Sequence, residues 1–208
     1  MRDLLGRGVD QAANQARVRL QQLDLVINEV DYDQPGDDHS EFVEIKNNGA
    51  SDIDLSTTGL VLVLFNGHAE APGPYQEVEL LSGTIEAGGY AVVASPNVSI
   101  PMGVPVFRFT DEHGVVRDTH IIQNGEPDGV ALYDHTLYDA RDALSYEGSM
   151  LSVSFDHNIF SLVEGYPTQI YDGGDGSMCR SPDGYDSDDA EIDWSFCATP
   201  TPGSMNSL

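Results

Sequence analysis

The sequence predicts an all-β fold, and within that class a β-sandwich, for most of its length. Three observations support this prediction. From Leu25 onward, short runs rich in β-branched and aromatic residues follow one another, a composition typical of strands. Clusters of Gly, Pro, Asn and Asp separate these runs, and no helix-period pattern lies between them, as expected for two packed sheets. No segment repeats at a fixed period, which excludes propellers and solenoids.

The first 23 residues differ in charge from the rest of the chain. They hold four of the nine basic residues and two acids, whereas the remaining residues hold five bases and 33 acids. Within Gly8–Leu23, apolar residues recur at spacings of 4, 3, 4 and 3, which predicts a short N-terminal α-helix or two heptads of coiled coil. We therefore divide the chain into an extension, residues 1–23, and a β-sandwich domain, residues 24–208. The extension docks, mediates self-association or serves as a linker.

Each strand-like run is bounded by turn residues such as Asn47-Asn48-Gly49, whose glycine supplies a positive φ. In Glu41–Lys46, apolar and charged residues are mixed, which predicts one solvated face. In contrast, Leu60–Phe65 is apolar throughout, and we expect it to be buried on both faces or beneath a lid. The predicted strands are Leu25–Val30, Glu41–Lys46, Leu60–Phe65, Tyr75–Leu81, Tyr90–Ala94, Val104–Phe109, Gly129–Tyr133, Leu137–Tyr146 and Trp194–Cys197.

The charge of the chain limits its function. Against 35 Asp and Glu stand 9 Lys and Arg, for a formal net charge of −26 over 208 residues. Such a field repels phosphate backbones and anionic lipid headgroups, which argues against direct nucleic-acid binding. No apolar run approaches the about 18 residues of a membrane span. The first residues also lack the apolar core of a signal peptide, so the signal of an exported form would be removed or lie outside this chain.

A series of short motifs follows in order through residues 25–206. They are LVINEVDYDQPGDDHSEFVEIKN from Leu25, DIDLSTTGL from Asp52, EAGGYAVVA from Glu86, DGVALYD from Asp128, DALSY from Asp142, PDGYDSDD after Arg180, Trp194, and TPGSMN from Thr201. In this order they resemble the lamin tail domain family in its bacterial form. One departure is Leu60, which stands where the family commonly has an aromatic residue.

The resemblance implies an immunoglobulin-like β-sandwich, here enlarged by insertions at Val115–Pro127 and Leu151–Asp172. Bacterial domains of this kind are typically found on secreted or surface proteins, often beside nucleases, phosphatases or adhesive repeats, and are regarded as non-catalytic. The animal relatives end the nuclear lamins. Since the charge and insertions of this chain depart from those relatives, and a shared fold does not confer a shared function, we do not carry a nuclear role over.

The chain contains two cysteines, Cys179 and Cys197, which flank an acidic C-terminal segment. A disulfide between them would close a loop of nearly twenty residues, worth about 3 kcal/mol in the chain-entropy model, and would require an oxidising compartment. Two separate reduced thiols are the alternative. A zinc site is a weaker one, because the chain has no CxxC motif and no His close by in sequence.

Carboxylates crowd into two loops, and crowded carboxylates need solvation, a raised pKa or a cation. Oxygen ligands around glycine suit Ca²⁺, although neither loop has the EF-hand spacing. A solvated acidic surface is the alternative, and structural Ca²⁺ is the cofactor that we expect. The candidate ligands are Asp31, Asp33, Asp37, Asp38 and Glu41 in the first loop and Asp183, Asp186, Asp188 and Asp189 in the second.

Motifs of catalysis are missing from the sequence. It contains no G-x-S-x-G elbow, no phosphate-binding or dinucleotide signature and no HExxH pair,. We expect its six His at surface or loop positions and not as ligands; His39 and His135 are the two candidates to follow, because each adjoins an acidic residue in the sequence. We expect Trp194 to fill the core. The sequence therefore predicts no enzyme.

We expect a non-catalytic interaction or assembly module, secreted or displayed on a bacterial cell surface. Its partner would be another protein or a second copy of the chain. Two other functions stay open. One is a self-assembling subunit of a filament, sheath or shell, in which residues 8–23 dock on the acidic body of a neighbour. The other is an accessory domain of a secreted nuclease- or phosphatase-type hydrolase.

Overall fold

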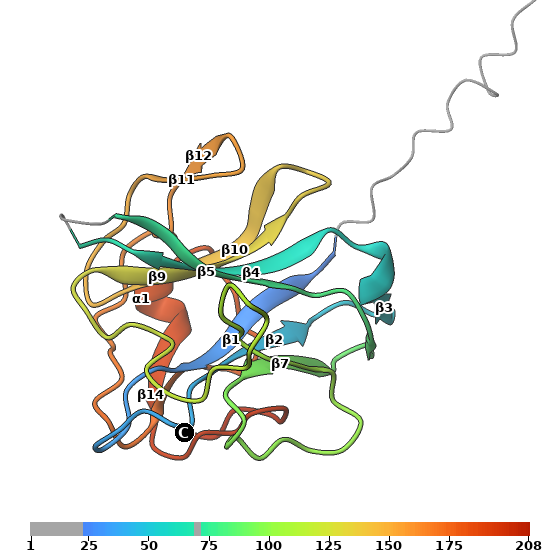
Figure 1. The fold of residues 1–208 in the computed structure, drawn as a ribbon, viewed down its shortest axis with the longest axis horizontal. Helices are drawn as coiled ribbons and strands as arrows, with labels where there is room; N and C mark the ends of the chain where they lie inside the picture. Colours follow the sequence, from blue (N-terminus) through green and yellow to red (C-terminus); the bar gives the residue numbers. More distant parts are fainter. Residues whose placement is uncertain (1–22, 69–71) are drawn as a thin grey trace, which may run out of the picture.

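The computed structural model describes residues 23–68 and 72–208, and in this part of the chain most regular structure is strand (Figure 1). The helix predicted over residues 8–23 and nearly all of the extension lie outside the described residues. Within them, no helix is long and apolar enough to cross a membrane. The two larger sheets face each other, which confirms the predicted immunoglobulin-like sandwich.

The larger sheet has six strands in the order β14-β13-β1-β2-β7-β8. All neighbours pair antiparallel except β7 and β8, which are parallel. The strands are β1 (Leu25–Asp31), β2 (Phe42–Asn47), β7 (Tyr90–Ala94), β8 (Val106–Phe107), β13 (Ser177–Arg180) and β14 (Trp194–Cys197). A four-residue helix, α1 (Ala190–Asp193), leads directly into β14.

The smaller sheet has the antiparallel order β10-β9-β4-β5, so β5 and β10 are its edge strands. Its strands are β4 (Leu60–Asn66), β5 (Gly73–Glu79), β9 (Asp128–Asp134) and β10 (Asp139–Tyr146). Two ribbons complete the described structure: β3 (Ile53–Asp54) with β6 (Thr84–Ile85), and β11 (Val153–Phe155) with β12 (Asn158–Phe160). A short 3-10 turn, η1 (Leu55–Thr57), follows β3.

Strand β4 explains how the sandwich is layered. Leu60, Leu62 and Leu64 point into the core between the two sheets, while Val61 and Phe65 lie on the opposite face in a second apolar cluster. The β11–β12 ribbon covers that face, and its aromatic rings pack edge-on against Phe65. The prediction that this strand is buried on both faces is therefore confirmed, and the insertion at residues 151–172 supplies the lid.

The core between the sheets contains Trp194, which is 3% exposed. The prediction that this residue fills the core is confirmed. Tyr32 and Tyr146 stack there with ring centroids 4.4 Å apart. Their burial brings the start of the first acidic loop against the end of β10.

The prediction of a solvated face on Glu41–Lys46 is wrong, because every residue of β2 is buried. The C-terminal segment lies over this face: Gly203 donates its backbone N–H to Glu44, and Asp183 pairs with Lys46. Strand β13 was not among the predicted strands, although it binds both β1 and β14. Its four residues are too few to display a period.

Candidate functional site

The first acidic loop does not gather its carboxylates around one point. Asp31 and Asp38 are buried, Asp33 is half-buried and Asp37 is exposed. Asp38 accepts the backbone N–H of Gln34 and contacts His120, whereas Asp31 accepts from the Gln34 side chain. In the described residues, no three carboxylates of this loop lie close enough to share an ion.

Asp31 instead meets Asp172, a carboxylate that sequence reasoning did not single out. Asp172 accepts the backbone N–H groups of Tyr32 and Asp33. Burial, and after it the neighbouring charge of Asp172, together raise the pKa of Asp31 to about 8. Two carboxylates in contact in a low-dielectric site cannot both ionise easily, so at neutral pH the pair holds one proton. A shared proton therefore reduces the repulsion between Asp31 and Asp172 in this part of the loop.

Glu41 fastens the first insertion to the sandwich. Its side chain is fully buried and one oxygen accepts the backbone N–H groups of Ile121 and Ile122. Burial raises the pKa of Glu41 to about 7, although these two hydrogen bonds act in the opposite direction. Glu41 therefore has a structural position under residues 115–127.

Asp183 opens the second acidic loop and binds protein groups on several sides. It forms an ion pair of 2.6 Å with Lys46 and accepts from Asn28 and from the Tyr90 hydroxyl. Burial acts to raise the pKa of Asp183, but these hydrogen bonds together outweigh it and lower the pKa. The next residue, Gly184, has φ +72°, and a Cβ there would meet the Asn48 side chain. Asp183 is thus the anchor of the loop.

The second acidic loop is arranged around Arg180, the last residue of β13, whose side chain is fully buried. The guanidinium pairs with Asp142 at 3.0 Å and with Asp193 at 3.2 Å, both of them buried. It also packs over the Trp194 ring at 5.2 Å. Two further carboxylates, Glu164 and Asp186, contact the same guanidinium from its more exposed side. One cation therefore faces four carboxylates drawn from four segments of the chain.

Glu164 carries a proton, which reduces the excess of negative charge that four carboxylates would place around one guanidinium. Burial raises its pKa, and the Asp142 carboxylate beside it raises the pKa further, to about 9. Asp142 lies directly against Arg180 and also accepts the backbone N–H of Ile27. We assign the ionised form to Asp142 and the proton to Glu164, because the fixed donors are arranged around Asp142.

Glu164 also belongs to a group that could hold a metal ion. Together with Asp186 and Asp188 it offers three carboxylate oxygens within 4.8 Å of one another. Asp186 and Asp188 are exposed and Glu164 is half-buried, so an ion could reach the group from solvent. Hard oxygen donors of this kind suit Ca²⁺, which completes its shell of six to eight oxygens with water. Two of the nine predicted ligands therefore meet, joined by Glu164 from the second insertion.

Asp189, the last predicted ligand, has a different position. It is the N-cap of α1 and accepts the backbone N–H of Glu191, the usual role of Asp at a helix start. Its backbone N–H faces Asp193.

The two cysteines form a disulfide, Cys179–Cys197, with Cα atoms 5.9 Å apart. It joins neighbouring strands β13 and β14 and encloses Arg180, the second acidic loop and α1. The prediction of a disulfide is confirmed. Because the bond restricts the unfolded chain across this loop, it contributes about 3 kcal/mol in the chain-entropy model.

The histidines considered above lie in loops. His39 is exposed and contacts the backbone carbonyl of Asp118. The His135 Nδ1 lies within hydrogen-bond distance of Asp156, at 2.8 Å, and the ring packs on Tyr133. In the described residues, neither belongs to a group of three potential metal ligands.

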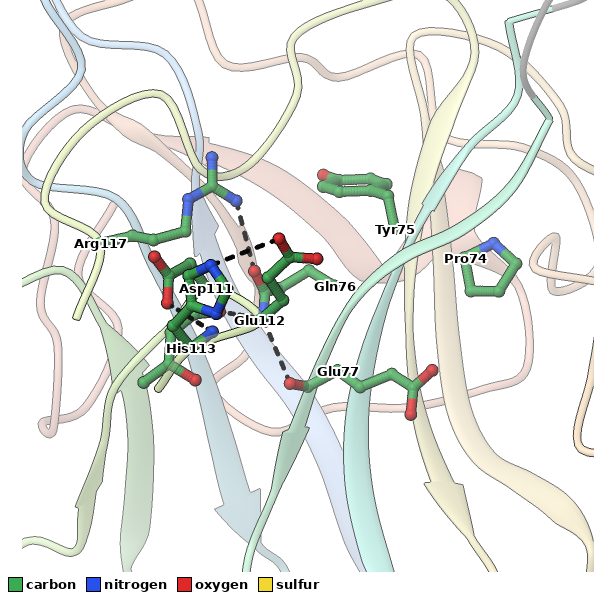
Figure 2. Close-up of a pocket in the computed structure, with 9 residues that line it drawn as sticks. Pro74, Tyr75, Gln76, Glu77, Asp111, Glu112, His113 and Arg117 are labelled. Atoms are coloured by element: carbon green, nitrogen blue, oxygen red, sulfur yellow. Dashed lines mark hydrogen bonds and ion pairs between the residues drawn. The ribbon is translucent and has the colours of Figure 1, made fainter. Parts of the chain in front are cut away.

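A separate groove of about 770 Å³ lies between β5 and the loop at residues 110–117 (Figure 2). Gln76 spans it, because its side chain donates to the Thr110 carbonyl and accepts from Arg117. In Figure 2 the Gln76 side chain reaches toward the loop, whereas the Glu77 carboxylate points to the opposite side of the strand. The lining is polar, with carboxylates from Asp111 and Glu112 on the loop.

Sequence reasoning missed Arg180, Glu164 and this groove. The signal for Arg180 was its isolation, since it is the single basic residue in the acidic C-terminal segment from residue 142 onward. Glu164 had no such signal, because its partners are brought to it only by folding. The groove depends on a loop that has no pattern of its own.

Comparison with known proteins agrees with the geometry. The family model described as Lamin Tail Domain matches residues 20–148, more than half of the chain. No curated protein matches the chain. The matched region includes β1, β2, β7 and β8 of the larger sheet and all four strands of the smaller sheet. The chain belongs to the lamin tail domain family.

Proposed function

We propose that the protein is a non-catalytic, extracellular interaction module. Its domain is immunoglobulin-like, of a family that serves protein interactions. A disulfide at the centre of the most charged region supports an oxidising location,. A net charge of −26 would keep such a module soluble and would favour partners with a basic surface.

One observation carries this proposal: buried carboxylates bind the loops to the sheets. Each accepts a backbone N–H from a segment distant in sequence, so its role is to hold the surface in one shape. A surface held this way is preorganised, and preorganisation lowers the entropic cost of binding a partner. The pairs are Glu29 with Thr201, Glu41 with Ile121 and Ile122, Glu44 with Gly203, Asp142 with Ile27, and Asp172 with Tyr32 and Asp33.

Fractionation of the native host, with thiols alkylated before reduction, tests the location. We expect the chain outside the inner membrane with Cys179 and Cys197 protected from alkylation. A cytosolic chain with both cysteines alkylated would contradict an extracellular role.

Phosphodiester, phosphomonoester and peptide substrates test the absence of catalysis. Equal background turnover is expected from the native chain and from the Asp186→Asn/Asp188→Asn variant, and turnover lost in the variant would reveal an enzyme.

We further propose that Ca²⁺ binds at Glu164, Asp186 and Asp188 and stabilises the fold. The three oxygens within 4.8 Å support this, as does the excess of carboxylates around Arg180. Ion binding would release the proton from Glu164, so the affinity should rise with pH. Solvated carboxylates without an ion are the alternative.

Millimolar CaCl₂ added to the chelated chain at pH 8 should raise the melting temperature by several degrees, since a site with Kd of about 10⁻⁴–10⁻³ M is filled at that concentration. EDTA should reverse the change. The Asp188→Asn variant should lose the response, while Asp175→Asn, an exposed control outside the group, should keep it. An equal rise in the melting temperature of Asp188→Asn, or the same rise with NaCl of matched ionic strength, would contradict a bound ion. The stabilisation would then come from general screening of the negative charges by salt.

A further inference from the structure

The outer edge of β5 is unpaired within the described residues. On its inner side β5 pairs with β4, and no strand pairs with its other side. Four of its seven residues, Gln76–Glu79, pair with β4 beyond the β-bulge at Tyr75, where the register shifts between Leu64 and Phe65. An unpaired strand edge offers free N–H and C=O groups to another chain.

The backbone groups that are free can be identified. Leu80 donates to the Leu60 carbonyl, and Val78 and Gln76 lie opposite Leu62 and Leu64. Because antiparallel pairing alternates, these even-numbered residues bond to β4 and the odd-numbered ones face outward. On this outer side the Glu77 carbonyl accepts from the Gln76 side chain, and its second lone pair remains for a bond to an added strand.

Two carboxylate side chains of β5 are open to solvent beside this edge. Glu77 and Glu79 are exposed, whereas Val78 between them is buried in the core. Glu77 and Glu79 stand opposite Val63 and Val61 and therefore share one face of the sheet,. A strand added beside β5 would place every second side chain next to these two carboxylates.

The other wall of the groove adds negative charge. Asp111 and Glu112 line it together with Glu77, and Glu112 is 86% exposed. Arg117 is the one Arg or Lys in the lining. Its guanidinium donates to Gln76 and to the His120 carbonyl, so it is already bound within the chain.

Charge selects among the possible occupants of this edge. A second copy of β5 would bring Glu77 and Glu79 against the same residues, and like charges on paired strands repel. Pro74 at the start of the strand further limits pairing there,. A strand with basic residues at alternate positions would instead meet carboxylates on its outer face and at the loop.

We propose that the β5 edge binds an extended basic segment of a protein partner, which adds to the four-stranded sheet as a fifth strand. The inference rests on the proposed interaction function and names its surface and its partner chemistry. Affinity would come from main-chain hydrogen bonds to Glu77 and Glu79, and selectivity from the alternating basic side chains. The Asp111 and Glu112 carboxylates would attract the segment before it pairs.

Fluorescence anisotropy with a labelled peptide, Lys-Thr-Lys-Thr-Lys-Thr-Lys, tests the proposal on the full chain. The Glu77→Lys/Glu79→Lys variant should bind at least about tenfold more weakly, because two favourable charge pairs become repulsive. The Glu86→Lys/Asp175→Lys variant makes the same change in net charge at exposed carboxylates outside β5. Its affinity should fall less than about threefold, since exposed distant charges are screened.

A second measurement does not depend on how any variant folds. The same peptide with N-methyl groups on alternate amides keeps its charge but cannot join a sheet, and it should bind the unaltered chain at least about tenfold more weakly. Equal binding of the methylated peptide, or equal losses in the two charge variants, would overturn the proposal in favour of diffuse attraction. Binding of a labelled peptide of residues 1–22, with no binding of the Lys-Thr peptide, would overturn it in favour of self-association. The proposed function stands in either case if the chain is extracellular and inactive on substrates.

Discussion

Replacing Arg180 by Met is expected to lower the free energy of unfolding by about 3–5 kcal/mol, because it leaves buried carboxylates without their cation. Asp142 and Asp193 lie 3.0 and 3.2 Å from the guanidinium and neither side chain reaches solvent. The substitution also removes the hydrogen bond to the Ile27 carbonyl and the contact with Trp194. Urea unfolding followed by Trp194 fluorescence measures the change, since this is the single Trp of the chain.

Arg141→Met is the matched control. Arg141 pairs with one carboxylate, Asp134, and is partly exposed. Asp134 keeps two hydrogen bonds from Thr136, so we expect a loss of about 1 kcal/mol. Arg180→Lys should fall between the two, because lysine keeps the charge but cannot reach several carboxylates at once. Similar losses for Arg180→Met and Arg141→Met would mean that the four-carboxylate arrangement contributes no more than the single Arg141–Asp134 pair.

The hydrophobic pattern was sufficient to predict the sandwich, since strands such as β4 and β9 are long enough to show their composition. Burial on both faces of β4 followed from six consecutive apolar residues. Strand β13 escaped prediction because its four residues, Ser-Met-Cys-Arg, combine polar and apolar types without alternation. The strands of the ribbons β3–β6 and β11–β12 have only two or three residues each, which is too few to show a period.

The acidic loops were harder to interpret, because a buried carboxylate and a solvated one are identical in sequence. Asp183 and Asp188 lie five residues apart in one loop, yet the first is bound by Lys46 and Asn28 and the second is exposed. What separates them is contact with β1 and β2, more than a hundred residues away. Glu44 shows the same effect, since its apparent solvated face is covered by the final residues of the chain.

Stability is expected to fall as the pH rises from about 5 to about 8, because several buried carboxyl groups must lose their protons over this range. Burial raises the pKa of Asp31 to about 8, of Glu44 to about 8 and of Glu41 to about 7. Carboxyl groups of the unfolded chain titrate near pH 4. Between these values the folded state binds more protons than the unfolded state, so the free energy of unfolding decreases with pH.

The raised and the lowered pKa values change the free energy of unfolding in opposite directions as the pH rises. The stabilisation from these raised groups is fully present below about pH 4 and is lost as the pH passes through their folded pKa values. Asp183 acts in the opposite sense, since its pKa is lowered and its contribution is lost on acidification below about pH 4. Thermal unfolding should therefore show a maximum near pH 4–5. A melting temperature that is constant or rises between pH 5 and 8 would contradict the assignment of protons to buried carboxyls.

Asp31→Asn isolates one of these groups and should stabilise the protein, more strongly at high pH. The amide keeps an oxygen for the Gln34 side chain, which donates to Asp31 Oδ1, but removes the repulsion with Asp172. Because one ionisation is worth about 1.4 kcal/mol per pH unit, the gain at pH 8 should exceed the gain at pH 5 by about 2–4 kcal/mol. Asp37→Asn is the control in the same loop, since the Asp37 side chain is 79% exposed and its replacement should change stability little at either pH. A gain for Asp31→Asn that is equal at both pH values would show that Asp31 is ionised throughout and that the buried pair does not share a proton.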